Sequence, residues 1–216
     1  MKKTLALTLL MLLVVFNLSA VAQDEEETEK DRGEFTFFGG IGMASGDLSD
    51  WGADSLNPGS GNNIGVEGGF FFTPNISAGL NFTYTSLGID SQDELAKDLT
   101  HRFYSPSLYM KYYFPTEGDF SPYVKATLGL DFARFTTSVD NIDGSRYRQI
   151  SYDPALAYSL GLGAFYYTAD YSGFFVEANY RMSQTENAEY DQNIKFGLNS
   201  TTIDIHAGFR LVIGSD

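Results

Sequence analysis

The chain alternates between apolar and polar residues with a period of two along most of its length after residue 34. In the segment ISAGLNFTYTS (76–86), every second residue from Ile76 to Tyr84 is apolar, and Ser, Gly, Asn and Thr stand between them. Successive side chains of a β-strand point to opposite faces, so this pattern predicts strands with one apolar and one polar face. Eight such strands are predicted, at residues 35–48, 61–73, 76–88, 100–114, 121–138, 151–168, 173–186 and 200–213.

The predicted connections alternate between short and long. Residues 73–75, 115–120 and 169–172 form the short ones. The long ones lie near residues 49–60, 89–99, 139–150 and 187–199. Short turns at one end and long loops at the other are typical of outer-membrane barrels, with the turns on the periplasmic side. An even number of strands then places both termini at the periplasmic end.

Alternation alone does not say which face of a barrel points outward. A soluble barrel turns its apolar face inward, and a membrane barrel turns it outward. The polar face here is mostly Gly, Ser, Thr, Asn, Ala and Tyr, with few charges, whereas a water-facing surface is about 25–35% charged. The apolar face carries no charge in mid-span, and aromatic residues gather near its ends, as they do at bilayer interfaces. This predicted aromatic girdle consists of Phe35, Phe72, Tyr112, Phe114, Tyr166 and Phe174 toward the turns, and Tyr84, Tyr104 and Tyr158 toward the loops.

The few charges on the polar face balance one another. They are Glu67, Asp131, Glu177 and Asp204 against Lys111, Lys125, Arg181 and Arg210, and His206 joins them as a further member of the predicted network. The lumen of an eight-stranded barrel is only wide enough for side chains to fill, and buried ions are costly unless paired. We therefore expect a plugged lumen.

Depth counted along each strand gives specific partners for these luminal ions. It predicts the pairs Glu177–Arg210 and Arg181–Asp204 on neighbouring strands. It also places Lys111 and Lys125 at similar depth, across the lumen from Glu177. Pro106 interrupts the fourth strand, and because proline has no N–H to donate, we expect a bulge or an early end of the strand there.

The first 34 residues stand apart from the barrel. Lys2 and Lys3, an apolar run at 5–16 and the sequence Ala20-Val21-Ala22 predict a cleaved signal peptide at residues 1–22, a retained N-terminal anchor being the alternative. Residues 23–34 form an acidic, non-periodic segment expected to be a disordered periplasmic tail. The barrel domain is then expected at 35–213, with residues 214–216 as the C-terminal end.

Composition narrows the chemistry. The sequence has no cysteine, which excludes N-terminal lipidation, disulfides and thiolate metal sites. A net charge of -14 argues against nucleic acid as a partner. The long loops are acidic, and carboxylates favour hard divalent cations, but no spaced ligand motif supports a metal site and no cofactor is expected. Trp51, in the first loop, is a candidate for an interface anchor or a contact with a partner.

The last strand carries the most specific motif. Residues 206–213 (HAGFRLVI) match the assembly signal of outer-membrane barrels, in which His206, Gly208, Leu211 and Ile213 occupy the defining positions. With eight strands, the chain resembles the small barrels typified by OmpX and the transmembrane domain of OmpA, although Gly214-Ser215-Asp216 follow in place of the usual terminal aromatic residue. The resemblance implies a monomer whose partners are the barrel-assembly machinery, periplasmic chaperones, and outer-membrane lipid and lipopolysaccharide.

Three classes of function stay open at this point. A non-enzymatic envelope scaffold or surface-interaction protein, acting through its long loops, is the leading interpretation. A small porin-like channel for ions or solutes is the second. The third is an enzyme that modifies lipid A, for which His101, with Asp98 and Ser105 near it in sequence, is the candidate general base.

Overall fold

The computed structural model describes residues 32–45, 58–89, 100–137, 148–191 and 194–214. Within these ranges the chain forms strands only, and none of its segments is a helix long and apolar enough to cross a membrane. The strands are β1 (Gly33–Ser45), β2 (Pro58–Thr73), β3 (Ile76–Ile89), β4 (Thr100–Tyr113), β5 (Phe120–Thr137), β6 (Arg148–Ser151), β7 (Ala155–Ala169), β8 (Ser172–Asp191) and β9 (Ile194–Ile213).

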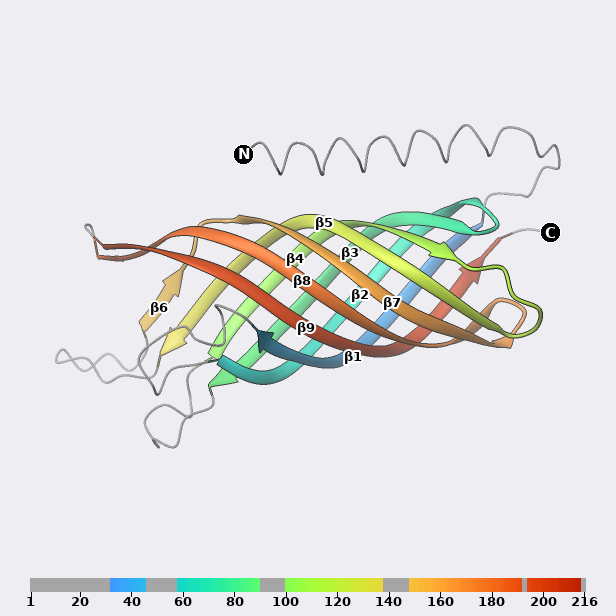
Figure 1. Ribbon diagram of the computed structural model, residues 1–216, viewed down its shortest axis with the longest axis horizontal. Helices are drawn as coiled ribbons and strands as arrows, with labels where there is room; N and C mark the ends of the chain where they lie inside the picture. The colour runs from blue at the N-terminus through green and yellow to red at the C-terminus, as the bar shows by residue number, and fades with distance from the viewer. Residues whose placement is uncertain (1–31, 46–57, 90–99, 138–147, 192–193, 215–216) are drawn as a thin grey trace. The chain divides into compact units, whose positions relative to one another are not determined.

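Eight of these strands close into one antiparallel barrel, which confirms the predicted fold class. The sheet runs in the order β4-β3-β2-β1-β9-β8-β7-β5, and pairing between β4 and β5 joins its two edges. The first and last strands meet side by side, with Gly33 opposite Ile213. Figure 1 shows the strands crossing the barrel obliquely, with the short turns gathered at the end where β1 begins and β9 finishes. We call this the turn end and the opposite one the loop end.

The alternation of apolar and polar residues along each strand determines which side chains fill the barrel. Leu80 and Leu162 project outward with 68% and 69% of their surface exposed, whereas Glu67 and Asp131 point inward and are 2% and 0% exposed. Burial therefore follows the period-two pattern in the sense expected for a membrane barrel, apolar outside and polar inside.

Three boundaries differ from the sequence-based expectation. β1 begins at Gly33, so Glu34 belongs to the barrel and not to a disordered tail. The expected loop at 187–199 is mostly strand, because β8 runs to Asp191 and β9 starts at Ile194. The strand expected at 151–168 is divided into β6 and β7 around Pro154, which has no N–H for the ladder. β6 lies beside the loop end of β5 (Figure 1).

Pro106 neither ends β4 nor creates a bulge, so the expectation for it was wrong. It lies inside β4, opposite Phe82 of β3, and no register shift occurs there. On the β5 side, pairing skips from Tyr104–Phe132 to Ser107–Gly129, which leaves two residues on each strand without a register partner in this ladder. The missing N–H of Pro106 therefore coincides with a short unpaired stretch between β4 and β5, and both strands continue beyond it.

Several predictions fall outside the described residues. These are the signal peptide at 1–22, residues 23–31 of the acidic tail, Trp51 and the acidic loops at 46–57, 90–99 and 138–147. They stay predictions.

Candidate functional site in the barrel lumen

The lumen holds the chemistry-bearing side chains of the barrel. The structure buries all nine residues of the predicted network inside it: Glu67, Lys111, Lys125, Asp131, Glu177, Arg181, Asp204, His206 and Arg210. They come from β2, β4, β5, β8 and β9, on the inward phase of each strand. Their contacts divide them into three levels between the turn end and the loop end.

The level nearest the turn end is built around Glu34 and Arg210. Arg210 Nη1 lies 3.4 Å from Glu34 Oε2, and the Arg210 guanidinium lies 3.6 Å from the centre of the Phe165 ring. Tyr109 and Ser77 donate hydrogen bonds to Glu34 Oε1 at 2.6 and 2.7 Å. Burying this ion pair is tolerable because hydrogen bonds and an aromatic face meet most of its polar atoms.

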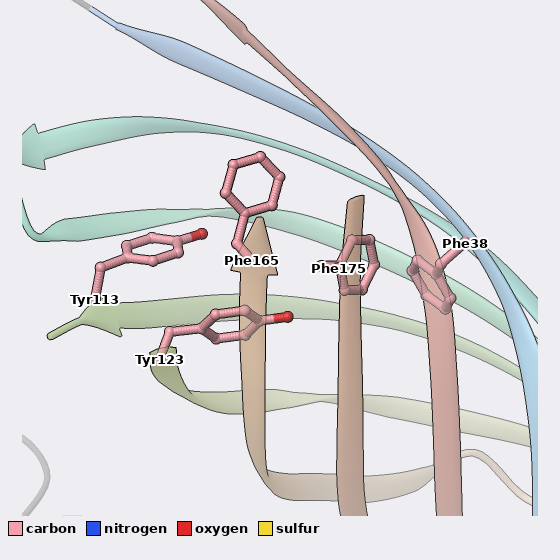
Figure 2. Close-up of a cluster of buried hydrophobic side chains, with 5 residues drawn as sticks. All are labelled: Phe38, Tyr113, Tyr123, Phe165 and Phe175. Atoms are coloured by element: carbon pink, nitrogen blue, oxygen red, sulfur yellow. The ribbon is translucent and has the colours of Figure 1, made fainter. Parts of the chain in front are cut away.

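Rings from five strands form a buried cluster, and two of them, Tyr113 and Phe165, contact this pair. Figure 2 shows Phe38, Tyr113, Tyr123, Phe165 and Phe175, which we call the aromatic seal, converging from β1, β4, β5, β7 and β8. All five are at most 5% exposed. Glycines make room for the rings. A Cβ at Gly65 would collide with the Phe38 ring, and one at Gly163 with the Tyr123 ring. Each glycine is the register partner of its ring on the neighbouring strand, so bare backbone on one strand accommodates a large ring from the strand beside it.

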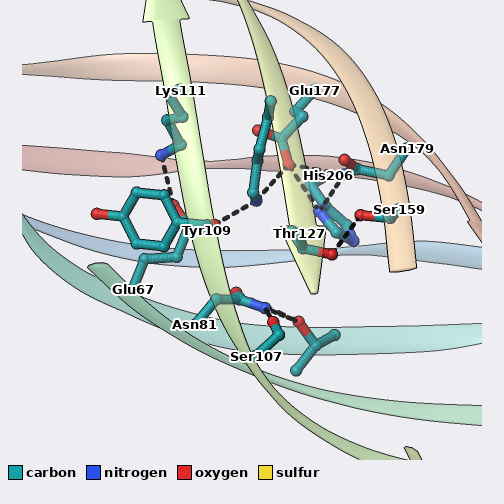
Figure 3. A network of polar contacts seen from close by, with 12 residues as sticks. Glu67, Asn81, Ser107, Tyr109, Lys111, Thr127, Ser159, Glu177, Asn179 and His206 are labelled. Atoms are coloured by element: carbon teal, nitrogen blue, oxygen red, sulfur yellow. Dashed lines mark hydrogen bonds and ion pairs between the residues drawn. The ribbon is translucent and has the colours of Figure 1, made fainter. Parts of the chain in front are cut away.

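The middle level is a cluster of four ions, Glu67, Lys111, Lys125 and Glu177, here called the ionic cluster. Figure 3 labels Glu67, Lys111 and Glu177. Lys111 and Lys125 stand directly opposite each other on β4 and β5. Like charges placed so are destabilising, but both ammonium groups donate to the carboxylate of Glu67 on β2. Lys125 also donates to Glu177 Oε1 at 2.8 Å, so the two bases and two acids form a chain.

Neutral groups complete the coordination of Glu177. Tyr123 Oη donates to Glu177 Oε2 at 2.9 Å, and Asn179 Nδ2 donates to Oε1 at 2.6 Å. His206 Nδ1 lies 3.5 Å from Oε1, and its ring stacks on Phe38 with the ring centres 4.5 Å apart. The ionic cluster is therefore joined to the aromatic seal through Tyr123 and Phe38.

The level toward the loop end is more open. Arg181 Nη1 lies 3.5 Å from Asp131 Oδ1, and Ser105 stands between them, accepting from Arg181 and donating to Asp131, each at 2.6 Å. Asn63 and Thr202 donate to Asp204 at 3.4 and 3.2 Å. A cavity of about 30 Å³ lies among these residues, bounded toward the turn end by Lys125 and His206. That volume holds about two waters.

The predicted partnerships within the network were partly wrong. On the β8–β9 ladder Glu177 faces His206 and Arg181 faces Thr202, so neither the Glu177–Arg210 nor the Arg181–Asp204 pair forms. Counting depth along each strand ignores the stagger between tilted neighbours, which a closed barrel imposes. The prediction that Lys111 and Lys125 share one depth was confirmed.

Sequence reasoning missed Glu34 and the tyrosines that surround the ions. Glu34 was assigned to the acidic tail, although it has the same inward phase as Thr36 and Phe38. Tyr109 and Tyr113 have the same phase as Lys111 on β4. Residues separated by an even number of positions on one strand point to the same face, and this rule could have identified all three as luminal.

The other predicted residues lie where alternation places them. The nine girdle aromatics project from the outer face, and Tyr84 packs beside Tyr104 with ring centres 5.1 Å apart. In β9, Leu211 and Ile213 point outward and His206 points inward. Contact of the girdle with the bilayer interfaces and recognition of the assembly signal stay predictions.

His101 lies at the loop end of β4 and points into the barrel. It is buried, and its ring lies 4.5 Å from that of Phe135. Ser105, considered as its catalytic neighbour, is hydrogen-bonded to Asp131 and Arg181, and Asp98 lies outside the described residues. Among the residues that the structure describes, no group of three or more His, Asp, Glu or Cys side chains is placed to hold a metal ion.

A closed barrel with an apolar exterior and a charged interior is the architecture of outer-membrane proteins. Comparison with known families shows which family the chain belongs to. The family model described as "Outer membrane protein beta-barrel domain" matches residues 8–213. The chain belongs to this family. Membership in the outer membrane protein β-barrel family places the chain in the bacterial outer membrane.

Solved structures agree on the fold. Neisserial surface protein A matches with a TM-score of 0.56 and 16% identity over 83% of this chain and 96% of that one. The outer membrane protein OprG from Pseudomonas aeruginosa matches with a TM-score of 0.53 and 18% identity over 85% and 97% of the two chains. No curated protein sequence matches the chain. At these identities the likeness concerns the fold alone.

Proposed function

We propose that the protein is a non-conducting, non-enzymatic scaffold of the outer membrane that presents its long loops at the cell surface. The observation that carries the proposal is the double closure of the lumen. The aromatic seal and the ionic cluster lie at successive depths and are connected through Phe38 and Tyr123. A hydrated ion would have to displace both buried rings and paired charges to pass.

Single-channel recording of the mature protein in planar bilayers tests this proposal. After insertion has been verified, we expect no conductance steps. The variant F38A/F165A/E67A/K111A/K125A/E177A opens both closures: it removes two rings of the aromatic seal together with two acids and two bases, and it leaves the net charge unchanged, so we expect steps from it. Its matched control, L80A/L162A, alters only the outer face and is expected to be silent. Stable steps from the unaltered protein would overturn the proposal.

The second candidate is a small-solute channel, and the loop-end cavity is the observation that favours it. This cavity is lined by polar groups such as Asn81, Thr127 and Ser159. It ends at Lys125 and His206, well short of the turn end. The same recording separates the two candidates, because transport requires steps from the unaltered protein.

The proposed absence of an enzymatic activity has its own test. Ser105, the serine considered as the partner of His101, is hydrogen-bonded to Asp131 and Arg181. We expect the lipid A mass spectrum of cells that overexpress the protein to match that of cells without it. A new lipid A species that disappears with His101→Ala would show that the protein is an enzyme.

The orientation, with turns and termini in the periplasm, is part of the same proposal. Its support is that β1 begins and β9 ends beside the short turns. The natural chain has no cysteine, so Glu117→Cys in the β4–β5 turn gives a single label site. We expect a membrane-impermeant maleimide to label it only after the outer membrane is opened. Labelling on intact cells would contradict the orientation.

A further inference from the structure

Two arginines stand side by side on the outer face of the barrel near its loop end. Arg102 of β4 is directly opposite Arg134 of β5, and both alternate with inward residues, Phe103 and Ala133. Cross-strand neighbours have Cβ atoms about 5 Å apart, and like charges at that spacing repel. Lys111 and Lys125 repeat this arrangement inside the lumen, where Glu67 neutralises them.

Nothing comparable neutralises the outer pair. Within the described parts of the chain, neither Arg102 nor Arg134 has a carboxylate partner, and Arg102 Nε makes no hydrogen bond. The other strand cations whose side chains the structure describes point into the lumen. The pair therefore concentrates positive charge on the outward-facing side of one hairpin.

The rows below the arginines become apolar toward mid-span. The next outward row is Tyr84, Tyr104 and Phe132, which are register partners on β3, β4 and β5. The Arg134 guanidinium lies 5.7 Å from the centre of the Tyr104 ring. The later rows hold Phe82 and Pro106, and then Leu80, Leu108 and Leu128.

This order of cations, aromatic rings and aliphatic side chains matches an amphiphile with an anionic head. Arginine's planar guanidinium binds phosphate oxygens through two parallel hydrogen bonds. An aromatic row suits the interface level of a bilayer, and the aliphatic rows suit acyl chains. A phosphate between Arg102 and Arg134 would also remove their mutual repulsion.

We propose that Arg102 and Arg134 form a binding site for the phosphate of lipopolysaccharide, with Tyr84, Tyr104 and Phe132 beneath its sugar and acyl groups. The choice of this lipid rests on the orientation proposed above, which puts the loop end in the outer leaflet. The site is distinct from the lumen, so it operates whether or not the barrel conducts.

Titration of the purified full-length mature protein in detergent with lipid A, followed by native mass spectrometry, tests the site. We expect Arg102→Gln and Arg134→Gln each to weaken lipid A binding about tenfold, because each loses charged hydrogen bonds. Arg32→Gln, which removes one charge before β1 at the turn end, is the matched control and should bind as the unaltered protein does. Binding by R102Q/R134Q equal to that of the unaltered protein would overturn the proposal.

The lipid can be varied without altering the protein, which keeps the test independent of folding. Dephosphorylated lipid A is expected to bind about tenfold more weakly than lipid A, and phosphatidylglycerol more weakly than lipid A as well. Equal binding of the dephosphorylated lipid would refute a phosphate site, and equal binding of phosphatidylglycerol would refute lipopolysaccharide as its ligand. Conductance and cysteine labelling judge the proposed function separately, so the failure of either proposal can be recognised.

Discussion

The two halves of the lumen are enclosed by the same strands but are filled in different ways. Toward the turn end, Glu34, Arg210 and the aromatic seal meet the ionic cluster with every carboxylate bound by at least two donors. Toward the loop end, hydrogen bonds to Asp204 are long, and a cavity of about 30 Å³ separates the walls. We therefore expect the turn-end half to contribute most of the stabilisation from luminal contacts, whereas the loop-end half leaves room for water.

The difference shows that matching charges is not enough to close a barrel. Asp131 and Arg181 balance each other as well as Glu67 and Lys111 do, yet they lie beside the cavity. The turn-end half is closed because rings fill the space around its ions, and the rings fit because Gly65 and Gly163 face them.

The largest expected effect comes from removing one carboxylate of the ionic cluster. Glu67→Ala leaves Lys111 and Lys125 facing each other without their shared partner, so we expect the free energy of unfolding to fall by about 3–5 kcal/mol. Asp204→Ala, in the loop-end half, should cost about 1 kcal/mol because it removes only long hydrogen bonds from two neutral donors. Urea titration in lipid vesicles measures both. Equal losses would show that the two halves do not differ.

Pairwise coupling should also differ between the halves. Double-mutant cycles with alanine are expected to give about 2–3 kcal/mol for Lys125–Glu177, at 2.8 Å, and about 1 kcal/mol for Arg181–Asp131, at 3.5 Å beside the cavity. The cycles use the same unfolding assay. A larger coupling for Arg181–Asp131 would reverse the comparison.

The glycines of the turn-end half should tolerate no side chain. Gly163→Ala places a Cβ against the Tyr123 ring, which Glu177 holds by a hydrogen bond, and we expect a loss of about 1–2 kcal/mol in unfolding free energy. Gly68→Ala, on the outer face with open space around its Cβ, is the control and should cost nothing measurable. If both variants unfold alike, the rings are not tightly confined.

The smallest effect is expected from filling the loop-end cavity. Ala157 points inward from β7 and lines this space. Ala157→Val adds two methyl groups where there is room, so the free energy of unfolding should change by less than about 0.5 kcal/mol. A loss above about 1 kcal/mol in the urea titration would mean that the loop-end half is packed as closely as the other.

Much of the fold could be predicted because a period of two leaves little ambiguity. Alternation located the strands, and the near absence of charge from one face indicated that this face is outside. The predicted strand boundaries were less accurate where polar or acidic composition suggested a tail or a loop. Glu34 follows an acidic run and was assigned to it, and residues 187–191 continue β8 although their polarity suggests a loop.

The sequence predicted which residues lie in the lumen, but it did not predict which of them contact one another. Inward parity identifies Glu177 and Arg210 as luminal, yet their contacts depend on the stagger between strands, which no single strand encodes. The outer arginines show the same limit. Arg102 and Arg134 are 32 positions apart in the sequence, and only the β4–β5 register brings them together.

The ion pair between Glu34 and Arg210 lies on the strands that join the two ends of the chain. Thr36 faces Arg210 across the β1–β9 ladder, so the two ions are diagonal neighbours at the seam. Within the barrel, β9 is synthesised after β1, and its arrival brings the base that neutralises a carboxylate on β1. A slip of two residues that set Phe38 opposite Arg210 would keep every apolar side chain outside but would move these charges apart. The pair thus favours the observed register over that shifted one, a distinction that hydrophobicity alone cannot provide.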